Sequence, residues 1–151
     1  MREQRGFTLL EILVVLVIGV LLVALVPPLL SGLGDATELR GAARQLAAGL
    51  RNARNDAITH QREAVLTLDL EQHRFGVTGN PQVIHLPDGL ALQIHTAQSE
   101  LINGAMGNIR FFPDGSSTGG HITVSGPKLA YQVNVDWLTG AIAIVERETR
   151  P

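Results

Sequence analysis

The chain has 151 residues, of which 45% are hydrophobic and 17% charged, and its formal net charge is −2. This length favours one globular domain, and the near-neutral charge lacks the overall basic footprint of nucleic-acid-binding proteins. The chain has no cysteine, which excludes a disulfide framework and thiolate-ligated metal or cluster sites.

The first predicted element is a long apolar helix behind a short charged start. Arg2 and Arg5 precede it, and every residue from 12 to 26 is apolar. Counted from Phe7, the segment has about 20 residues, which at about 1.5 Å per residue would cross a hydrocarbon core of about 30 Å. Residues 7–30 are therefore predicted to form a transmembrane or filament-core helix.

Three interpretations of this segment compete. A cleavable secretory signal fits the charged start, but its apolar core is typically about 7–15 residues long and carries no acid. A single-span anchor fits the length, and Arg2 and Arg5 would then hold the N-terminus in the cytoplasm by the positive-inside tendency. Neither explains Glu11, because a carboxylate at mid-bilayer costs on the order of 3 kcal/mol, and less near the interface.

The third interpretation gives Glu11 a role in assembly. If the chain is cut between Gly6 and Phe7, Phe7 gains an α-amine that is positively charged at neutral pH. Glu11 lies four residues further on, which is about one helical turn. In a bundle of such helices, the carboxylate of one subunit would neutralise the amine of its neighbour, so that neither charge stays unpaired in an apolar environment.

The run Arg5-Gly6-Phe7-Thr8-Leu9-Leu10-Glu11 resembles the class III signal of type IV pilins and type II secretion pseudopilins. That signal is a short basic leader, Gly, an aromatic residue or Met, Thr-Leu and a hydrophobic residue, then Glu. The resemblance implies that residues 1–6 are a leader and that the prepilin peptidase reads Gly6. It also implies that Phe7 becomes the N-methylated first residue and that Glu11 sets the assembly register.

A second helical segment follows an interruption rich in proline and glycine. Pro28 is predicted to kink the helix, because proline removes a backbone hydrogen bond, and pilin helices often carry a kinking proline at this position. Helix signals resume at Asp35 or Thr37, which are both suitable N-caps. Apolar residues then recur with a helical period at Leu39, Ala42, Ala43, Leu46, Leu50, Ala53 and Ala57. Residues 31–60 are therefore predicted to form an amphipathic stem whose apolar stripe lies on the following domain.

The polar side of this stem carries a row of arginines. Within one narrow arc, at about 100° per residue, lie Arg40, Arg44, Arg51 and Arg54. Such a row is typical of a solvated helix face. The alternative interpretation is a surface that meets acidic groups on neighbouring subunits.

Beyond the stem, residues 61–151 are predicted to form a β domain, because hydrophobic residues alternate and turns with Gly or Pro separate the runs. The predicted strands cover residues 65–70, 75–77, 83–86, 90–94, 109–112, 122–124, 129–135 and 141–145. Residues 96–108 lack periodicity and are predicted to be a long loop. The fold class is therefore α+β and type IV pilin-like: a long N-terminal helix packed on an antiparallel β-sandwich or β-sheet domain.

No constellation of residues in the β region supports catalysis, a metal or a cofactor. The histidines are not spaced in the sequence as the ligands of a metal site are. They are His60, His73, His85, His95 and His121. Ser116 and Ser117 lie in a Gly-rich turn but not in a Gly-x-Ser-x-Gly elbow. Trp137 is predicted to pack in the core or against a hairpin. We therefore expect the protein not to be an enzyme.

The β region also resembles the GspH/FimT branch of pilin-like proteins. The resemblance lies in the turn over residues 112–120 and in the helix–strand junction from 50–54 to 65–69. It implies a minor pseudopilin of the type II secretion system, near the tip of the periplasmic pseudopilus that helps export folded proteins across the outer membrane. The alternative is a FimT-like minor type IV pilin, which would act in pilus assembly or in DNA binding and uptake.

The same resemblance implies where the protein lies and what it contacts. The chain would cross the bacterial inner membrane once, with its N-terminus in the cytoplasm and its β domain in the periplasm. Its partners would be the major and minor pseudopilins of one filament and the prepilin peptidase, with secreted substrates as a further candidate. Nucleic acid is not an expected partner, because DNA binding needs a basic patch and Lys128 is the only lysine in the chain.

Overall fold

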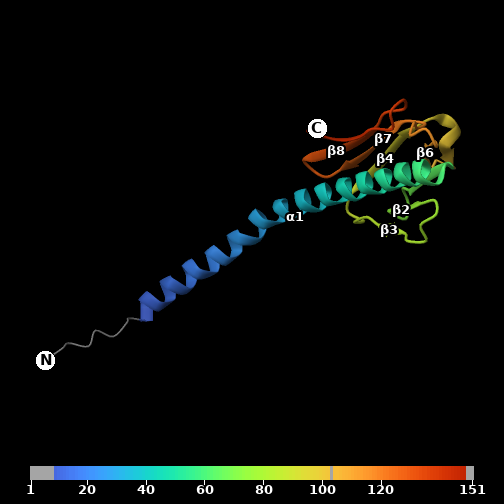
Figure 1. Ribbon diagram of the computed structural model, residues 1–151. Helices are drawn as coiled ribbons and strands as arrows, with labels where there is room; N and C mark the ends of the chain where they lie inside the picture. The colour runs from blue at the N-terminus through green and yellow to red at the C-terminus, as the bar shows by residue number, and fades with distance from the viewer. Residues whose placement is uncertain (1–8, 103, 149–151) are drawn as a thin grey trace. The chain divides into compact units, whose positions relative to one another are not determined.

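The computed structural model describes residues 9–102 and 104–148, without the side chains of residues 22–35. The chain forms two units that divide between Asp35 and Ala36. The helix α1 (Leu9–His60) contributes residues to both units. In the second unit the described residues form two antiparallel sheets beside α1 (Figure 1).

The backbone of α1 stays helical where the sequence predicts a new start. Asp35 and Thr37 both lie inside the helix, so the prediction that one of them caps a second helix is wrong. A proline lacks only its own N–H donor, so helical bonds on either side of it can persist. The side chain of Pro28 lies outside the described residues, and the kink there stays a prediction.

The first sheet has the strand order β3-β2-β1-β6-β5. Its strands are β1 (Ala64–Asp69), β2 (Arg74–Val77), β3 (Ile84–His85), β5 (Leu101–Ile102) and β6 (Met106–Phe111). β1 is central, with Leu66 opposite Val77 of β2 and opposite Ile109 of β6. Both pairings are antiparallel.

The second sheet has the strand order β4-β7-β8-β9. Its strands are β4 (Ala91–Thr96), β7 (Gly120–Ser125), β8 (Leu129–Val135) and β9 (Ile142–Glu148). β9 pairs with β8 along its whole length. Because β9 is the last strand in this order, one of its two edges faces no other strand of the described chain.

The predicted fold class, a long helix with antiparallel sheets, is confirmed, and the predicted strands correspond to observed ones. The prediction that residues 96–108 form a long loop is wrong. This stretch contains the 3₁₀ helix η1 (Gln98–Glu100) and β5, and β6 begins within it at Met106. Elements of two or three residues are too short to leave a hydrophobic period in the sequence.

The part of α1 beyond Asp35 supplies the centre of the hydrophobic core. Its buried hydrophobic residues are those of the predicted stripe together with Ala47: Leu39, Ala42, Ala43, Leu46, Ala47, Leu50, Ala53 and Ala57. The same core contains Phe75 and Ile109 from the first sheet and Ile122 and Val133 from the second. Figure 1 shows β2 and β3 on one side of this part of α1 and β4, β7 and β8 on the other. The helix therefore joins two sheets into one core.

Two glycines of α1 give a matched test of this packing. A Cβ added at Gly49 would lie 2.5 Å from Cε2 of Phe75 and 3.1 Å from Cδ1 of Leu66, whereas one at Gly41 would meet nothing within 4 Å. We predict that Gly41→Ala raises the free energy of unfolding by about 0.5–1 kcal/mol, because alanine suits a helix better than glycine. Gly49→Ala should lower it by about 1–3 kcal/mol, because the new methyl group overpacks the core.

Urea denaturation of the full chain in detergent, followed by near-ultraviolet circular dichroism of the second unit, measures both effects. Equal changes in the two variants would contradict the close packing of α1 on the first sheet.

Candidate functional site

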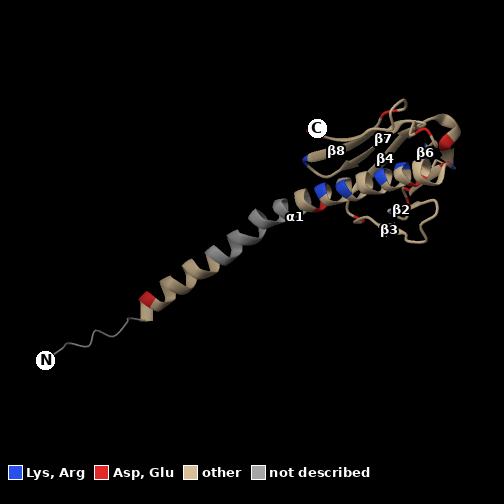
Figure 2. Cartoon of the chain, viewed as in Figure 1, with Lys and Arg blue, Asp and Glu red and all other residues tan. Residues whose placement is uncertain are grey.

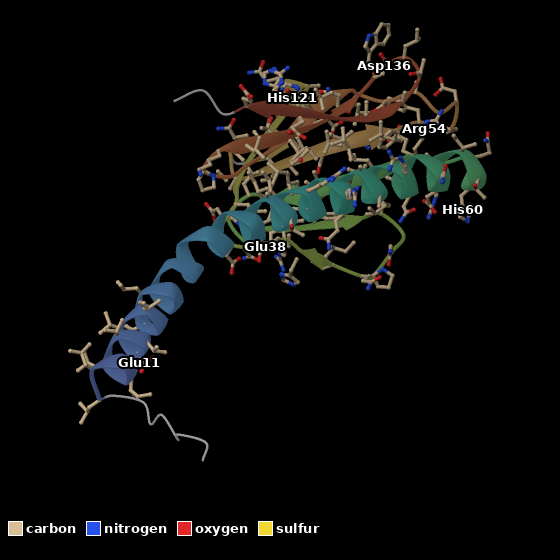
Figure 3. The ribbon with its side chains drawn as sticks, turned by 90° about the vertical axis from the view of Figure 1, so that its left-hand side faces the viewer. Glu11, Glu38, Arg54, His60, His121 and Asp136 are labelled. Carbon is tan, nitrogen blue, oxygen red and sulfur yellow. The ribbon has the colours of Figure 1, made fainter. Side chains whose placement is uncertain are left out.

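The processing site predicted at the N-terminus lies partly outside the described residues. Nothing of Gly6 or Phe7 is described. Glu11 is exposed and lies in the first turn of α1, where the helix dipole favours a carboxylate (Figure 3). Its predicted pairing with the α-amine of a neighbouring subunit stays a prediction.

Large apolar side chains surround Glu11 on the described part of the first unit. Their exposed fractions run from 45% at Val14 to 85% at Leu9. Because such residues occupy nearly every position from 9 to 21, every side of the helix is apolar. An exposed apolar surface of this extent marks contact with other proteins or with lipid.

Among the residues that the structure describes, no helix meets the combined length and hydropathy that a membrane crossing requires.

The arginine row of α1 divides into one residue that holds the fold and three that are exposed. Arg54 donates from Nε to the carbonyl of Gly115 at 3.2 Å and from Nη2 to the carbonyl of Thr139 at 3.0 Å. The exposed members are Arg40, Arg44 and Arg51. The ion pairs of the described arginines instead involve Arg62, Arg74 and Arg110. Figure 2 shows the basic residues of α1 along its part beside the sheets.

Two grooves lie between these arginines and β9. The first, of about 330 Å³, is lined by Arg40, Arg44, Tyr131, Ile144 and Glu146. The second, of about 230 Å³, is lined by Arg51, Arg54, Asn55, Gly140, Ala141 and Ile142. Later residues of α1 thus lie beside the start of β9 and earlier residues of α1 lie beside its later part, so helix and strand run antiparallel along one line. We call this line, with the residues of both grooves, the α1–β9 seam.

Inside the seam one acidic side chain already has a partner. The hydroxyl of Tyr131 donates to Oε2 of Glu146 at 3.0 Å. Burial, followed by this hydrogen bond, raises the pKa of Tyr131 above its ordinary value, and the tyrosine therefore stays a donor. Glu146 is the only acidic residue among those that line the two grooves.

The turn between β8 and β9 displays two apolar side chains on a well-bonded backbone. Trp137 is 66% exposed and Leu138 64% exposed, so a place for Trp137 in the core is wrong. The carboxylate oxygen Oδ1 of Asp136 accepts from the N–H of Leu138 at 3.1 Å and from the N–H and hydroxyl of Thr139, both at 2.8 Å. These bonds, the backbone one from Thr139 foremost, hold the pKa of Asp136 below its ordinary value. The bonded turn directs the tryptophan outward.

An ion pair between the buried Glu100 and the partly buried Arg110 fixes the segment that follows β4. Glu100 is 6% exposed. Its Oε1 and Oε2 accept from Nε and Nη2 of Arg110 at 2.9 and 3.4 Å, and Nη1 of Arg110 donates to Oε2 of Glu63 at 2.7 Å. The two carboxylates, Glu100 first, raise the pKa of Arg110. This network makes residues 98–102 part of the fold, and sequence reasoning missed it because the spacing of the three residues has no pattern.

The histidines do not gather into a metal site. His95 and His121 lie directly opposite each other on β4 and β7, and their rings stack with centroids 5.1 Å apart. Burial, followed by the charges of His95 and Arg147, lowers the pKa of His121. Within residues 9–102 and 104–148 no group of three or more His, Asp or Glu side chains could hold a metal ion.

Comparisons with known proteins match both the N-terminal motif and the second unit. The model of the prokaryotic N-terminal methylation motif matches residues 1–27, and that of the type II transport protein GspH matches residues 42–140. The chain is 33% identical over 141 residues to the type II secretion system protein H of Xanthomonas campestris pv. campestris. This alignment covers 93% of the chain and 83% of that relative.

Two solved structures share the fold. The minor pseudopilin EpsH from the type 2 secretion system of Vibrio cholerae matches with a TM-score of 0.57 and 13% identity, covering 72% of this chain and 96% of EpsH. The type IV minor pilin FimU of Pseudomonas aeruginosa matches with a TM-score of 0.58 and 13% identity, covering 77% of this chain and 96% of FimU. At this identity the likeness extends to the fold alone.

Arg54 and Arg51 line the same groove and give a matched pair of variants. We predict that Arg54→Gln speeds hydrogen exchange in the β8–β9 turn by about tenfold, because two bonds from a charged donor, each worth about 1.5–3 kcal/mol, tie that turn and the β6–β7 turn to α1. Arg51→Gln removes the same charge one helical turn away. It should leave exchange of residues 136–141 unchanged. Equal rates in both variants would mean that Arg54 does not hold the turn.

Proposed function

The chain belongs to the family of the type II transport protein GspH, and from this membership we propose that it is a minor pseudopilin, a structural subunit of the type II secretion pseudopilus. The observation that carries the proposal is the order of the two matches, a methylation motif over residues 1–27 followed by the GspH model over residues 42–140. The 33% identity to a protein named type II secretion system protein H supports the same system.

The work of such a subunit is mechanical. In the proposed filament, the apolar side chains of residues 9–21 pack against the helices of neighbouring subunits, since they are exposed on every side of α1. Their burial gains about 25 cal/mol for each Å² of apolar surface removed from water. The second unit has its own closed core, so it can serve as a rigid body outside the helix bundle, near the tip of a filament that helps export folded proteins across the outer membrane.

Processing at the N-terminus prepares the subunit for this assembly. We propose that the prepilin peptidase removes residues 1–6 after Gly6 and that Phe7 becomes the N-methylated first residue. The match to the N-terminal methylation motif supports this step. Before assembly, the subunit lies in the inner membrane with its N-terminus in the cytoplasm, in keeping with Arg2 and Arg5, and with its second unit in the periplasm.

A minor type IV pilin is the second candidate, because the fold of FimU matches as well as that of EpsH. The family model and the curated relative favour the secretion system over the pilus. No enzymatic step enters this proposal, because a filament subunit acts by binding its neighbours.

The assembly role of Glu11 can be tested against a second exposed acid of α1, Glu38. We predict that Glu11→Ala keeps the subunit in the membrane but lowers its incorporation into filaments by about a hundredfold, because leaving a buried charge without its partner costs about 3–5 kcal/mol. Glu38→Ala should assemble like the wild type.

Sheared filaments and membranes of the native host, probed with an antibody to the second unit, separate incorporation from insertion. Normal assembly and secretion with Glu11→Ala would show the charge-pairing account to be wrong.

A further inference from the structure

β9 offers a row of backbone groups that no other described strand uses. It is the last strand of the second sheet and pairs only with β8 there, over Ile142–Glu148. In an antiparallel ladder, alternate residues direct N–H and C=O toward the neighbouring strand, and the others direct them away. From Ala143 to Glu148 every residue of β9 is exposed. Such an edge is a template for one further strand.

The arginines that line the seam run beside β9 from its start to Glu146. From Arg40 to Arg54, α1 rises about 21 Å at about 1.5 Å per residue. From Gly140 to Glu146, the strand extends about 20 Å at about 3.3 Å per residue. The two grooves of the seam place these stretches side by side, with Arg40 and Arg44 near the end of β9 and Arg51 near its start.

Alternation along β9 decides which side chains meet the arginines. Ile142, Ile144 and Glu146 line the seam. The residues between them point to the other face of the sheet, where Arg147 influences the pKa of His121. A strand added beside β9 would alternate in the same way. Every second side chain, at intervals of about 6.6 Å, would then point toward the arginine row.

We propose that the α1–β9 seam binds an extended acidic segment of a neighbouring filament subunit. The segment is six or seven residues long, about the length of the seam. It adds to the second sheet as a strand beside β9 and directs acidic side chains at alternate positions toward Arg40, Arg44 and Arg51. Backbone bonds supply affinity, as in other cases of strand addition, and carboxylate–guanidinium pairs supply the preference for acid. The identity of the partner as a filament subunit rests on the proposed function.

The seam fits a protein strand better than nucleic acid. A phosphate backbone cannot use the N–H and C=O groups of β9 as a ladder. Within the described chain, Glu146 accepts the hydroxyl of Tyr131 and forms no ion pair with the arginines of the seam.

The first test titrates the full chain in detergent with the peptide acetyl-Thr-Glu-Val-Glu-Val-Glu-Thr-amide and follows hydrogen exchange. The β9 amides that do not bond to β8 should become protected. The variant Arg40→Glu with Arg44→Glu should weaken binding by about tenfold or more, because like charges then face each other. Arg147→Glu reverses one charge, on the other face of β9, and should leave the affinity unchanged. Equal weakening by both variants would overturn the proposal.

A second pair of peptides tests the backbone ladder. Methylating the backbone nitrogens of one alternate set of residues should abolish the protection of β9, whereas methylating the other set should preserve it, because one edge of the peptide pairs. Equal binding of both methylated peptides would mean attraction by charge alone and would overturn the proposal. The proposal would also be overturned if duplex DNA, and not the peptide, protected the amides of β9 from hydrogen exchange.

A photo-cross-linking amino acid in the native host tests the partner. Placed at Ile144 in the seam, it should join the chain to another filament subunit, and placed at the exposed Gln93 of β4 it should not. Cross-links from position 144 to secreted proteins alone would overturn the identity of the partner. The peptide experiments do not depend on filament assembly, so their failure would leave the proposed function intact, and failure of the Glu11 assay would leave the seam intact.

Discussion

The burial of one helix stripe between two sheets is the interaction on which the second unit depends. The stripe from Leu39 to Ala57 has little or no exposed surface, and its core neighbours come from both sheets. Alanine and glycine hold many of its positions, so strands can approach the helix backbone closely. At Gly49 the side chain of Phe75 occupies the space that a Cβ would take. An amphipathic sheet cannot close a core by itself, and here one helix serves both sheets.

This arrangement also explains how the polar side of the helix is used. Because the stripe faces the core, the arginines at its border lie beside β9 and the β8–β9 turn. Arg54 is close enough to hold two turns through their carbonyl oxygens. Arg40, Arg44 and Arg51 stay exposed and give the edge of the second sheet a positive border. One helix thus fixes both the fold of the second unit and the charge beside the edge of its second sheet.

Regular periods in the sequence predicted most of this fold. The helical recurrence from Leu39 to Ala57 is a property of neighbouring residues, and so is the alternation in β1 and β8. The sequence could not reveal which strands pair, and so the stack of His95 on His121 could not be foreseen. It also could not reveal the pairing of Glu100 with Arg110, which decides that residues 98–102 are ordered structure. Asp35 and Thr37 are residue types that favour helix N-caps, but in the structure α1 continues through both positions.

The candidate assembly site was predicted mainly from the sequence motif, and the geometry of the described residues adds less to it. Glu11 lies on a helix whose apolar side chains face outward on every side, and this surface requires partners. The roles of Gly6 and Phe7 are predicted from the motif alone. The exposed arginines were foreseen as a row, but the role of Arg54 was not, because the carbonyl groups it binds come from distant turns.

The assembly account supposes that peptidase action creates the cation that Glu11 meets. Intact-mass spectrometry of the subunit isolated from its native host tests this most directly. The account predicts a chain that begins at Phe7 and carries one additional methyl group on its α-amine. A mature chain that begins at any other residue, or that retains residues 1–6, would contradict it.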